Sequence, residues 1–121
     1  MLTVRYLILF LLLAPRLVSQ VDEARLLRAI SAVESNCNPA AVGSHGERGA
    51  EQMLPAMRRH YGTPMAMLHD LERQLPRIGI DPTPYTLALG YHLGITKLAR
   101  REIPDSAVAY AQRVRAIYIS P

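Results

Sequence analysis

The sequence has 121 residues, of which half are apolar and one is a cysteine. This length favours a single domain with a small core, and a lone cysteine excludes an internal disulfide. The formal charge of +4 includes Arg5 and Arg16; the remaining 12 basic residues face 10 acidic ones, which leaves +2 with no basic stripe and argues against a nucleic-acid partner.

The first 19 residues have the layout of a secretory signal peptide. Arg5 precedes an apolar run from Leu7 to Ala14. This run is shorter than the roughly 20 apolar residues that a membrane-spanning helix needs. We therefore predict a signal peptide at 1–19, a single catalytic domain at 20–121 without a stable membrane span, and a location in the periplasm or outside the cell.

Helical spacing of apolar residues recurs along the rest of the chain, and strand alternation is absent. Threonine-proline pairs at 63–64 and 83–84 are typical signals for a helix N-terminus. A loop rich in Gly, Ser and Asn is expected over 36–51. The predicted helices span 22–35, 55–61, 64–78, 84–93, 95–101 and 104–118.

The segment 84–93 is apolar almost all round, as is typical of a buried helix. Gly90 within it costs about 1 kcal/mol relative to Ala, which a close approach by another helix would explain. The sequence therefore predicts an all-α fold, a small helical domain around one buried helix, acting as a monomer.

Glu34 stands at the end of the helix predicted over 22–35. The partial negative charge at a helix C-terminus disfavours an ionised carboxylate there, and desolvation acts in the same direction. Both effects predict a raised pKa, which suits a general acid that protonates a leaving oxygen. The alternative is a solvent-exposed glutamate with an ordinary pKa.

Four blocks of the sequence resemble the soluble lytic transglycosylase domain, a relative of goose-type lysozyme. They are ESNCNP, SHGERGAEQMLP, YTLALGYHLG and YAQRVRAIY. They are similar to the family patterns E-S-x-x-N-P, S-x-x-G-x-x-G-x-x-Q-x-x-P, A-x-x-Y-N-x-G and Y-A-x-R-V-x-x-Y, in the same order. The resemblance implies a lysozyme-like domain that cleaves the β-1,4 bond between N-acetylmuramic acid and N-acetylglucosamine in peptidoglycan.

Carried over to this chain, the resemblance implies that Glu34 is the sole catalytic acid and base, with no cofactor or metal. One carboxylate suffices if the sugar's own 6-hydroxyl is the nucleophile, because closure of a 1,6-anhydro ring needs no activated water. The muramic acetamide or a nearby donor then stabilises the cationic centre. The resemblance assigns substrate contacts to Ser35, Ser44, Gln52, Tyr91, His92 and Tyr110.

Two residues depart from the family pattern. Glu51 replaces a bulky apolar residue before Gln52, and is expected either as an acid near the start of the next helix or as a second carboxylate in the cleft. His92 replaces an asparagine; neutral imidazole can also donate and accept a hydrogen bond, but its protonation would change the contact. Glu47 is expected to be a loop charge that pairs with Arg48.

Three functions stay open on the sequence alone. The first is a lytic transglycosylase that acts on the glycan strand of peptidoglycan. The second is a lysozyme-type hydrolase of the same bond, and the third is a glycan-binding or assembly protein with a decayed site. Cys37 is expected as a small buried apolar residue, with a reactive or intermolecular thiol as the alternative.

Overall fold

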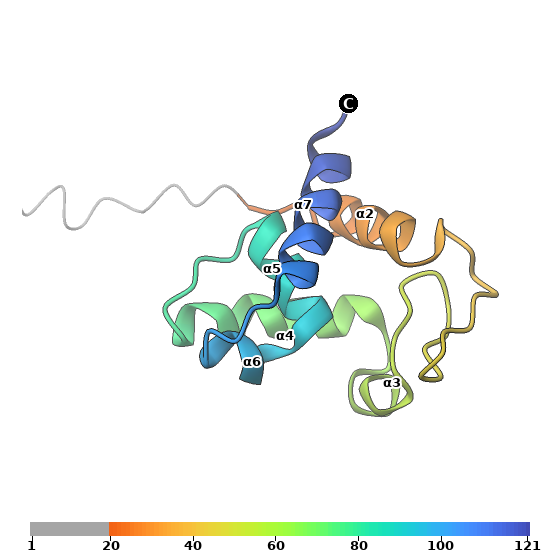
Figure 1. Cartoon of the computed structure of the whole chain (residues 1–121), viewed down its shortest axis with the longest axis horizontal. Coiled ribbons are helices and arrows are strands. Elements are labelled where there is room, and N and C mark those ends of the chain that lie inside the picture. The colour runs from red at the N-terminus through yellow and green to blue at the C-terminus, as the bar shows by residue number, and fades with distance from the viewer. Residues whose placement is uncertain (1–19) are drawn as a thin grey trace, which may run out of the picture.

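The computed structural model describes residues 20–121, and these form six helices without a named strand (Figure 1). The all-α prediction is confirmed for this part of the chain, whereas the signal peptide predicted at 1–19 lies outside the described residues. The helices are α2 (Glu23–Ser35), α3 (Pro55–Tyr61), α4 (Pro64–Arg77), α5 (Pro84–Leu93), α6 (Ile95–Ala99) and α7 (Asp105–Ile119). Within this part, no helix is long and apolar enough to cross a membrane.

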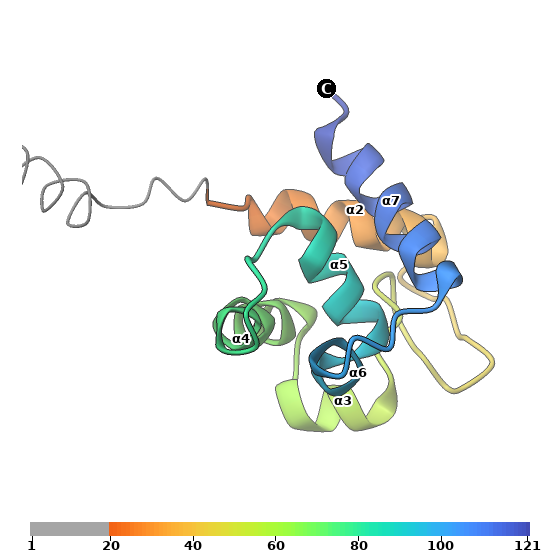
Figure 2. The same ribbon diagram turned by 60° about the vertical axis from the view of Figure 1, so that its left-hand side comes forward.

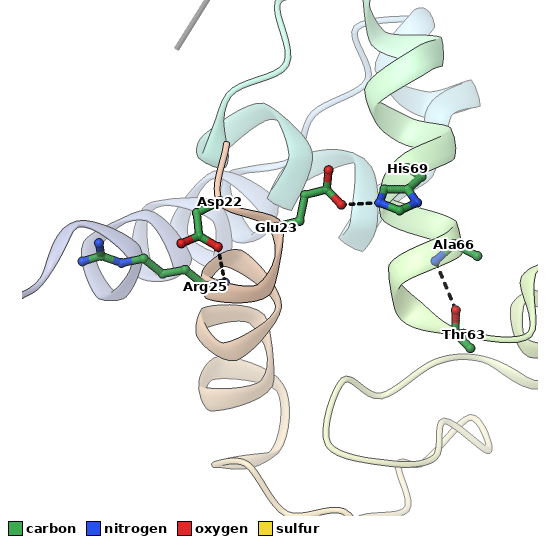
Figure 3. Close-up of polar contacts among 6 residues, drawn as sticks. All are labelled: Asp22, Glu23, Arg25, Thr63, Ala66 and His69. Atoms are coloured by element: carbon green, nitrogen blue, oxygen red, sulfur yellow. Dashed lines mark hydrogen bonds and ion pairs between the residues drawn. The ribbon is translucent and has the colours of Figure 1, made fainter. Parts of the chain in front are cut away.

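Side-chain caps fix the starts of three helices. The side chains of Asp22 and Thr63 each accept a hydrogen bond from a backbone N–H in the first turn, at 3.1 and 3.2 Å (Figure 3). Thr83 and Thr86 form a reciprocal capping box at the start of α5. Each cap satisfies an N–H that lacks a partner within the helix, a contribution of about 1 kcal/mol. The two threonine-proline signals therefore mark helix starts as predicted.

Helix α5 is the buried helix, and it lies between α4 and α7 (Figure 2). Its residues from Leu87 to Tyr91 are all buried. A Cβ atom on Gly90 would lie 3.0 Å from Cδ2 of Leu71 on α4, which is tighter than ordinary van der Waals contact. The close helix approach predicted from Gly90 is confirmed, and it explains why a residue of low helix propensity occupies this position.

The start of α2 is joined to the end of α7. The backbone N–H of Asp22 donates to the Tyr118 hydroxyl at 3.0 Å, and Nη2 of Arg25 donates to the Ser120 carbonyl at 2.6 Å. The Arg25 guanidinium also lies 5.4 Å from the centre of the Tyr118 ring, within range of a cation–π contact. These contacts gather at the end of α2 that is opposite Glu34.

Helix α2 ends in a left-handed turn. Asn36 has φ 54°, and the N–H groups of Asn36 and Cys37 donate to the carbonyls of Ala32 and Ser31, both at 3.1 Å. The bond from Asn36 to Ala32 is the one that defines the αL motif, and both bonds satisfy carbonyls at the helix end. Cys37 is exposed with φ 60°. The prediction that it is buried is wrong, because the turn carries its side chain away from the core.

Candidate active site

A pocket of about 340 Å³, here called the glutamate pocket, opens beside the C-terminal end of α2. Helices α2, α3, α4 and α5 and the loop between α2 and α3 all contribute to it. The polar lining is Glu34, Ser44, Glu47, Gln52, Tyr91 and His92, and the apolar lining includes Met53, Leu54, Met57 and Met67. A pocket with an apolar wall and a few convergent polar groups is typical of a small-molecule or sugar site.

Glu34 is half-buried in this pocket, and its pKa is raised. Burial is the main cause, because a charged carboxylate loses hydration there. The negative charge of Glu47 raises the pKa further, whereas the Tyr110 hydroxyl lowers it. The direction of the shift and the contribution of desolvation agree with the prediction, and the neighbouring carboxylate is an additional cause that was not predicted.

Glu47 is the second carboxylate of the pocket, contrary to the prediction that it pairs with Arg48. The loop folds back so that the Gly43 N–H donates to the Glu47 carbonyl at 2.8 Å. The Glu47 carboxylate accepts from the His45 N–H at 3.0 Å and lies 3.3 Å from Nδ1 of His45. Its pKa is lowered, first by its own backbone N–H and then by His45. Two carboxyls whose pKa values are shifted in opposite directions share one pocket, a pattern typical of acid and base pairs.

Glu51 does not line the glutamate pocket, so of its two alternatives the second cleft carboxylate is wrong. Its backbone carbonyl accepts a hydrogen bond of 3.1 Å from the Tyr91 hydroxyl. The pKa of Tyr91 is raised, chiefly by burial and then by the charges of Glu51 and Glu34. Tyr91 lines the pocket as predicted and also anchors the loop to α5.

His92 and Tyr110 form a stacked pair beside Glu34. Their ring centroids are 4.3 Å apart and their planes differ by 22°. The Tyr110 hydroxyl is close enough to affect the pKa of Glu34, yet it is buried and lacks a well-formed hydrogen bond within residues 20–121. Burial and then the charges of Lys97 and Arg113 lower the pKa of His92. His92 therefore lines the pocket as a neutral ring over a wider pH range than an ordinary histidine.

The remaining predicted site residues make hydrogen bonds within the loop between α2 and α3, and only some of them line the glutamate pocket. Gln52 has φ 51°, and its Nε2 donates to the carbonyls of Ala41 and Gly49 at 3.2 and 2.8 Å, which leaves only its carbonyl oxygen for a ligand. Ser35 does not line the pocket; its hydroxyl donates to the Ala50 carbonyl at 2.6 Å. Ser44 lines the pocket, with its hydroxyl 3.2 Å from Nδ1 of the adjacent histidine.

The sequence contained a signal for Glu47 that the prediction did not use. Glycines at 43, 46 and 49 surround it, and Gly46 and Gly49 have φ values of 82° and 88°. Such closely spaced glycines permit a tight reversal, which returns residue 47 to the side of residue 43. Within residues 20–121, no group of three or more His, Cys, Asp or Glu side chains is arranged to hold a metal ion.

Comparison with known proteins adds no family assignment. No protein-family model, curated protein or solved structure matches the chain.

Proposed function

We propose that residues 20–121 form a lysozyme-like catalytic domain that cleaves the β-1,4 glycosidic bonds of peptidoglycan as a lytic transglycosylase. The observation that carries the proposal is the half-buried Glu34, whose pKa is raised within an open pocket. The four sequence blocks that resemble the transglycosylase domain support it, because they contribute Glu34, Gln52, Tyr91 and Tyr110 to one neighbourhood.

In this reaction, protonated Glu34 gives its proton to the bridging oxygen as the bond to that oxygen breaks. The neutral carboxylic acid is the form that burial favours. Ionised Glu34 then takes the proton from the 6-hydroxyl of the muramic sugar, whose oxygen closes the 1,6-anhydro ring. One side chain thus acts first as acid and then as base, and no water enters the products.

A second pocket supports a polymeric substrate. It has a volume of about 410 Å³ and adjoins the glutamate pocket, because Met57 and Met67 line both. Two adjoining pockets offer room for several units of a glycan strand, rather than for one monosaccharide. Export to the periplasm or the cell exterior, after removal of residues 1–19, would bring the domain to this substrate.

A hydrolase that cleaves the same bond is the second candidate, and Glu47 is the observation that favours it. Glycosidases that use water usually need two carboxylates. Glu47 is ionised at neutral pH, as a base that activates water must be, although its lowered pKa makes it a weaker base than an ordinary glutamate. Glu34 would be the acid in either reaction, so the two candidates differ only in the nucleophile.

The deciding experiment is digestion of purified peptidoglycan followed by mass spectrometry of the released fragments. A transglycosylase produces 1,6-anhydro ends, and a hydrolase produces reducing ends that are 18 mass units heavier by one water. The Glu34→Gln variant should release neither product, whereas the matched Glu51→Gln variant should keep its activity. Full activity of Glu34→Gln would contradict both enzymatic candidates, and binding without release by the wild type would favour a glycan-binding protein.

A further inference from the structure

A basic pocket shares the side chain of Met53 with the glutamate pocket. It has a volume of about 310 Å³, and we call it the arginine pocket. Met53, which is 2% exposed, lines both this pocket and the glutamate pocket. The arginine pocket is lined by Gly46, Arg48, Met53, Pro55, Arg58 and Arg59. Because Met53 lines both pockets, a ligand bound in one pocket would lie close to a ligand bound in the other.

The three guanidinium groups of this pocket have no acidic partner in the described chain. The ion pairs found within residues 20–121 are His45–Glu47, His69–Glu23 and Arg73–Asp70. Three like charges around one concavity repel one another, although Arg58 and Arg59 also lie in the last turn of α3, where the helix dipole favours positive charge. A guanidinium without an acidic partner keeps donors of its planar fork for an external carboxylate or phosphate.

One of these arginines is held in place by the loop. Nη2 of Arg58 donates to the backbone carbonyl of Arg48 at 3.0 Å. A Cβ atom on Gly49 would lie 3.4 Å from the same nitrogen, and the φ of Gly49 is 88°. The positive φ favours glycine at this position, and the guanidinium lies within ordinary van der Waals range of it. An arginine positioned in this way loses less conformational freedom when an anion binds.

We propose that the arginine pocket binds carboxylates of the peptides that the muramic sugars carry. This inference rests on the proposed function, because peptidoglycan is the substrate that places a peptide next to the bond being cleaved. Carboxylates fit the arginine forks, and the apolar surface of Met53 and Pro55 suits small side chains such as alanine methyl groups. The pocket would thus recognise peptide-bearing muramic sugars.

The test compares two soluble ligands. The first is an uncrosslinked glycan strand that carries its peptides, and the second is the same strand after an amidase has removed the peptides. Binding is measured in a Glu34→Gln background, so that no strand is cleaved. The peptide-bearing strands should bind at least about tenfold more tightly, as expected for hydrogen bonds to charged groups. Arg59→Gln and the double variant Arg58→Gln/Arg59→Gln should reduce this preference progressively.

The matched control is Arg77→Gln/Arg115→Gln, which removes the same charge from exposed positions outside the pocket. It should keep the preference for peptide-bearing strands. Arg59 makes no side-chain hydrogen bond within residues 20–121, so Arg59→Gln tests the pocket even if loss of the Arg58 contact disturbs the loop. Thermal melts of every variant establish whether the fold is retained.

Equal affinity for both strands, or an equal loss in the control variant, would overturn the inference. The inference would also be overturned if the arginine-dependent affinity survived removal of the peptides but was lost when hydrofluoric acid removed phosphodiesters from the strands. That result would favour a phosphate ligand. Peptide-dependent binding by a wild type that cleaves nothing would contradict the proposed enzyme and leave this pocket standing. Cleavage without any preference for peptide-bearing strands would overturn the inference about the arginine pocket and leave the proposed enzyme standing.

Discussion

A Cβ atom on Gly43 would lie 2.0 Å from Oε2 of Glu47 and 2.8 Å from Oε1 of Gln52. The missing side chain at position 43 is therefore what allows both groups to reach the glutamate pocket. Since Glu47 in turn raises the pKa of Glu34, one glycine controls the electrostatic environment of the proposed catalytic acid.

The first prediction concerns this effect of Glu47. In Glu47→Gln, the pKa of Glu34 should fall, because a neutral amide no longer opposes ionisation of the acid. The alkaline limb of the activity profile should therefore move to lower pH. Gly43→Ala should move it the same way, since its Cβ displaces only the flexible ends of two side chains. Initial rates of peptidoglycan clearing from pH 4 to 9 measure the limb, and an unmoved limb in both variants would contradict the coupling.

The second prediction concerns Glu34→Gln. Loss of a general acid typically lowers a rate by about 10²–10⁴-fold. The folded-state pKa of Glu34 is raised, so this group stabilises the fold fully below its unfolded pKa, and that contribution is lost as pH rises through the folded pKa. The variant should therefore gain stability relative to the wild type as pH increases.

Urea unfolding at several values between pH 4 and pH 8 tests this stability difference. The Glu51→Gln variant is the control, because its side chain does not line the pocket. A stability of Glu34→Gln that falls or stays constant relative to the wild type as pH rises would contradict the burial of Glu34.

The third prediction compares two buried tyrosines. The Tyr110 hydroxyl makes no well-formed hydrogen bond within the described chain, although it is close enough to Glu34 to lower the pKa of that carboxyl, whereas the Tyr91 hydroxyl donates to the Glu51 backbone carbonyl. Tyr110→Phe should keep or raise the free energy of unfolding, and Tyr91→Phe should lower it by about 1 kcal/mol. Tyr110→Phe should also move the alkaline limb to higher pH, because the hydroxyl lowers the pKa of Glu34. Equal destabilisation by the two changes would show that Tyr110 is bonded.

The fourth prediction concerns Cys37, whose thiol is exposed on the turn after α2. A thiol reagent such as Ellman's reagent should label one group per chain in the native protein, without denaturant. Cys37→Ser should abolish labelling and leave peptidoglycan clearing unchanged, because the residue does not line the glutamate pocket. Labelling that requires denaturant would restore the buried cysteine first expected from the sequence.

Sequence periodicity predicted the helices well, because their ends carry local chemistry. Thr63 and Thr83 supply caps, and the all-round apolar pattern from Leu87 to Tyr91 identifies the buried helix. Glu34 was likewise accessible to sequence reasoning, since it ends a regular helix. These features depend on neighbours within a few residues along the chain.

The loop from 36 to 54 could not be predicted in the same way. Its shape depends on single hydrogen bonds and on left-handed residues such as Gln52, with φ 51°, and neither has a periodic signature. Sequence reasoning consequently considered Glu51, and not Glu47, as the possible second carboxylate of the cleft. It also expected the amide of Gln52 to contact the sugar, although the nitrogen of that amide holds the loop together.

The contacts between the start of α2 and the end of α7 bear on how the protein can be handled. Ser120 is bonded to Arg25, and Glu34 lies nine residues farther along the same helix, roughly 14 Å away at 1.5 Å per residue. An affinity tag, a fluorophore or a solid support attached at residue 121 would thus stand clear of the pocket. Protein immobilised through residue 121 would therefore keep its glutamate pocket accessible to insoluble wall fragments.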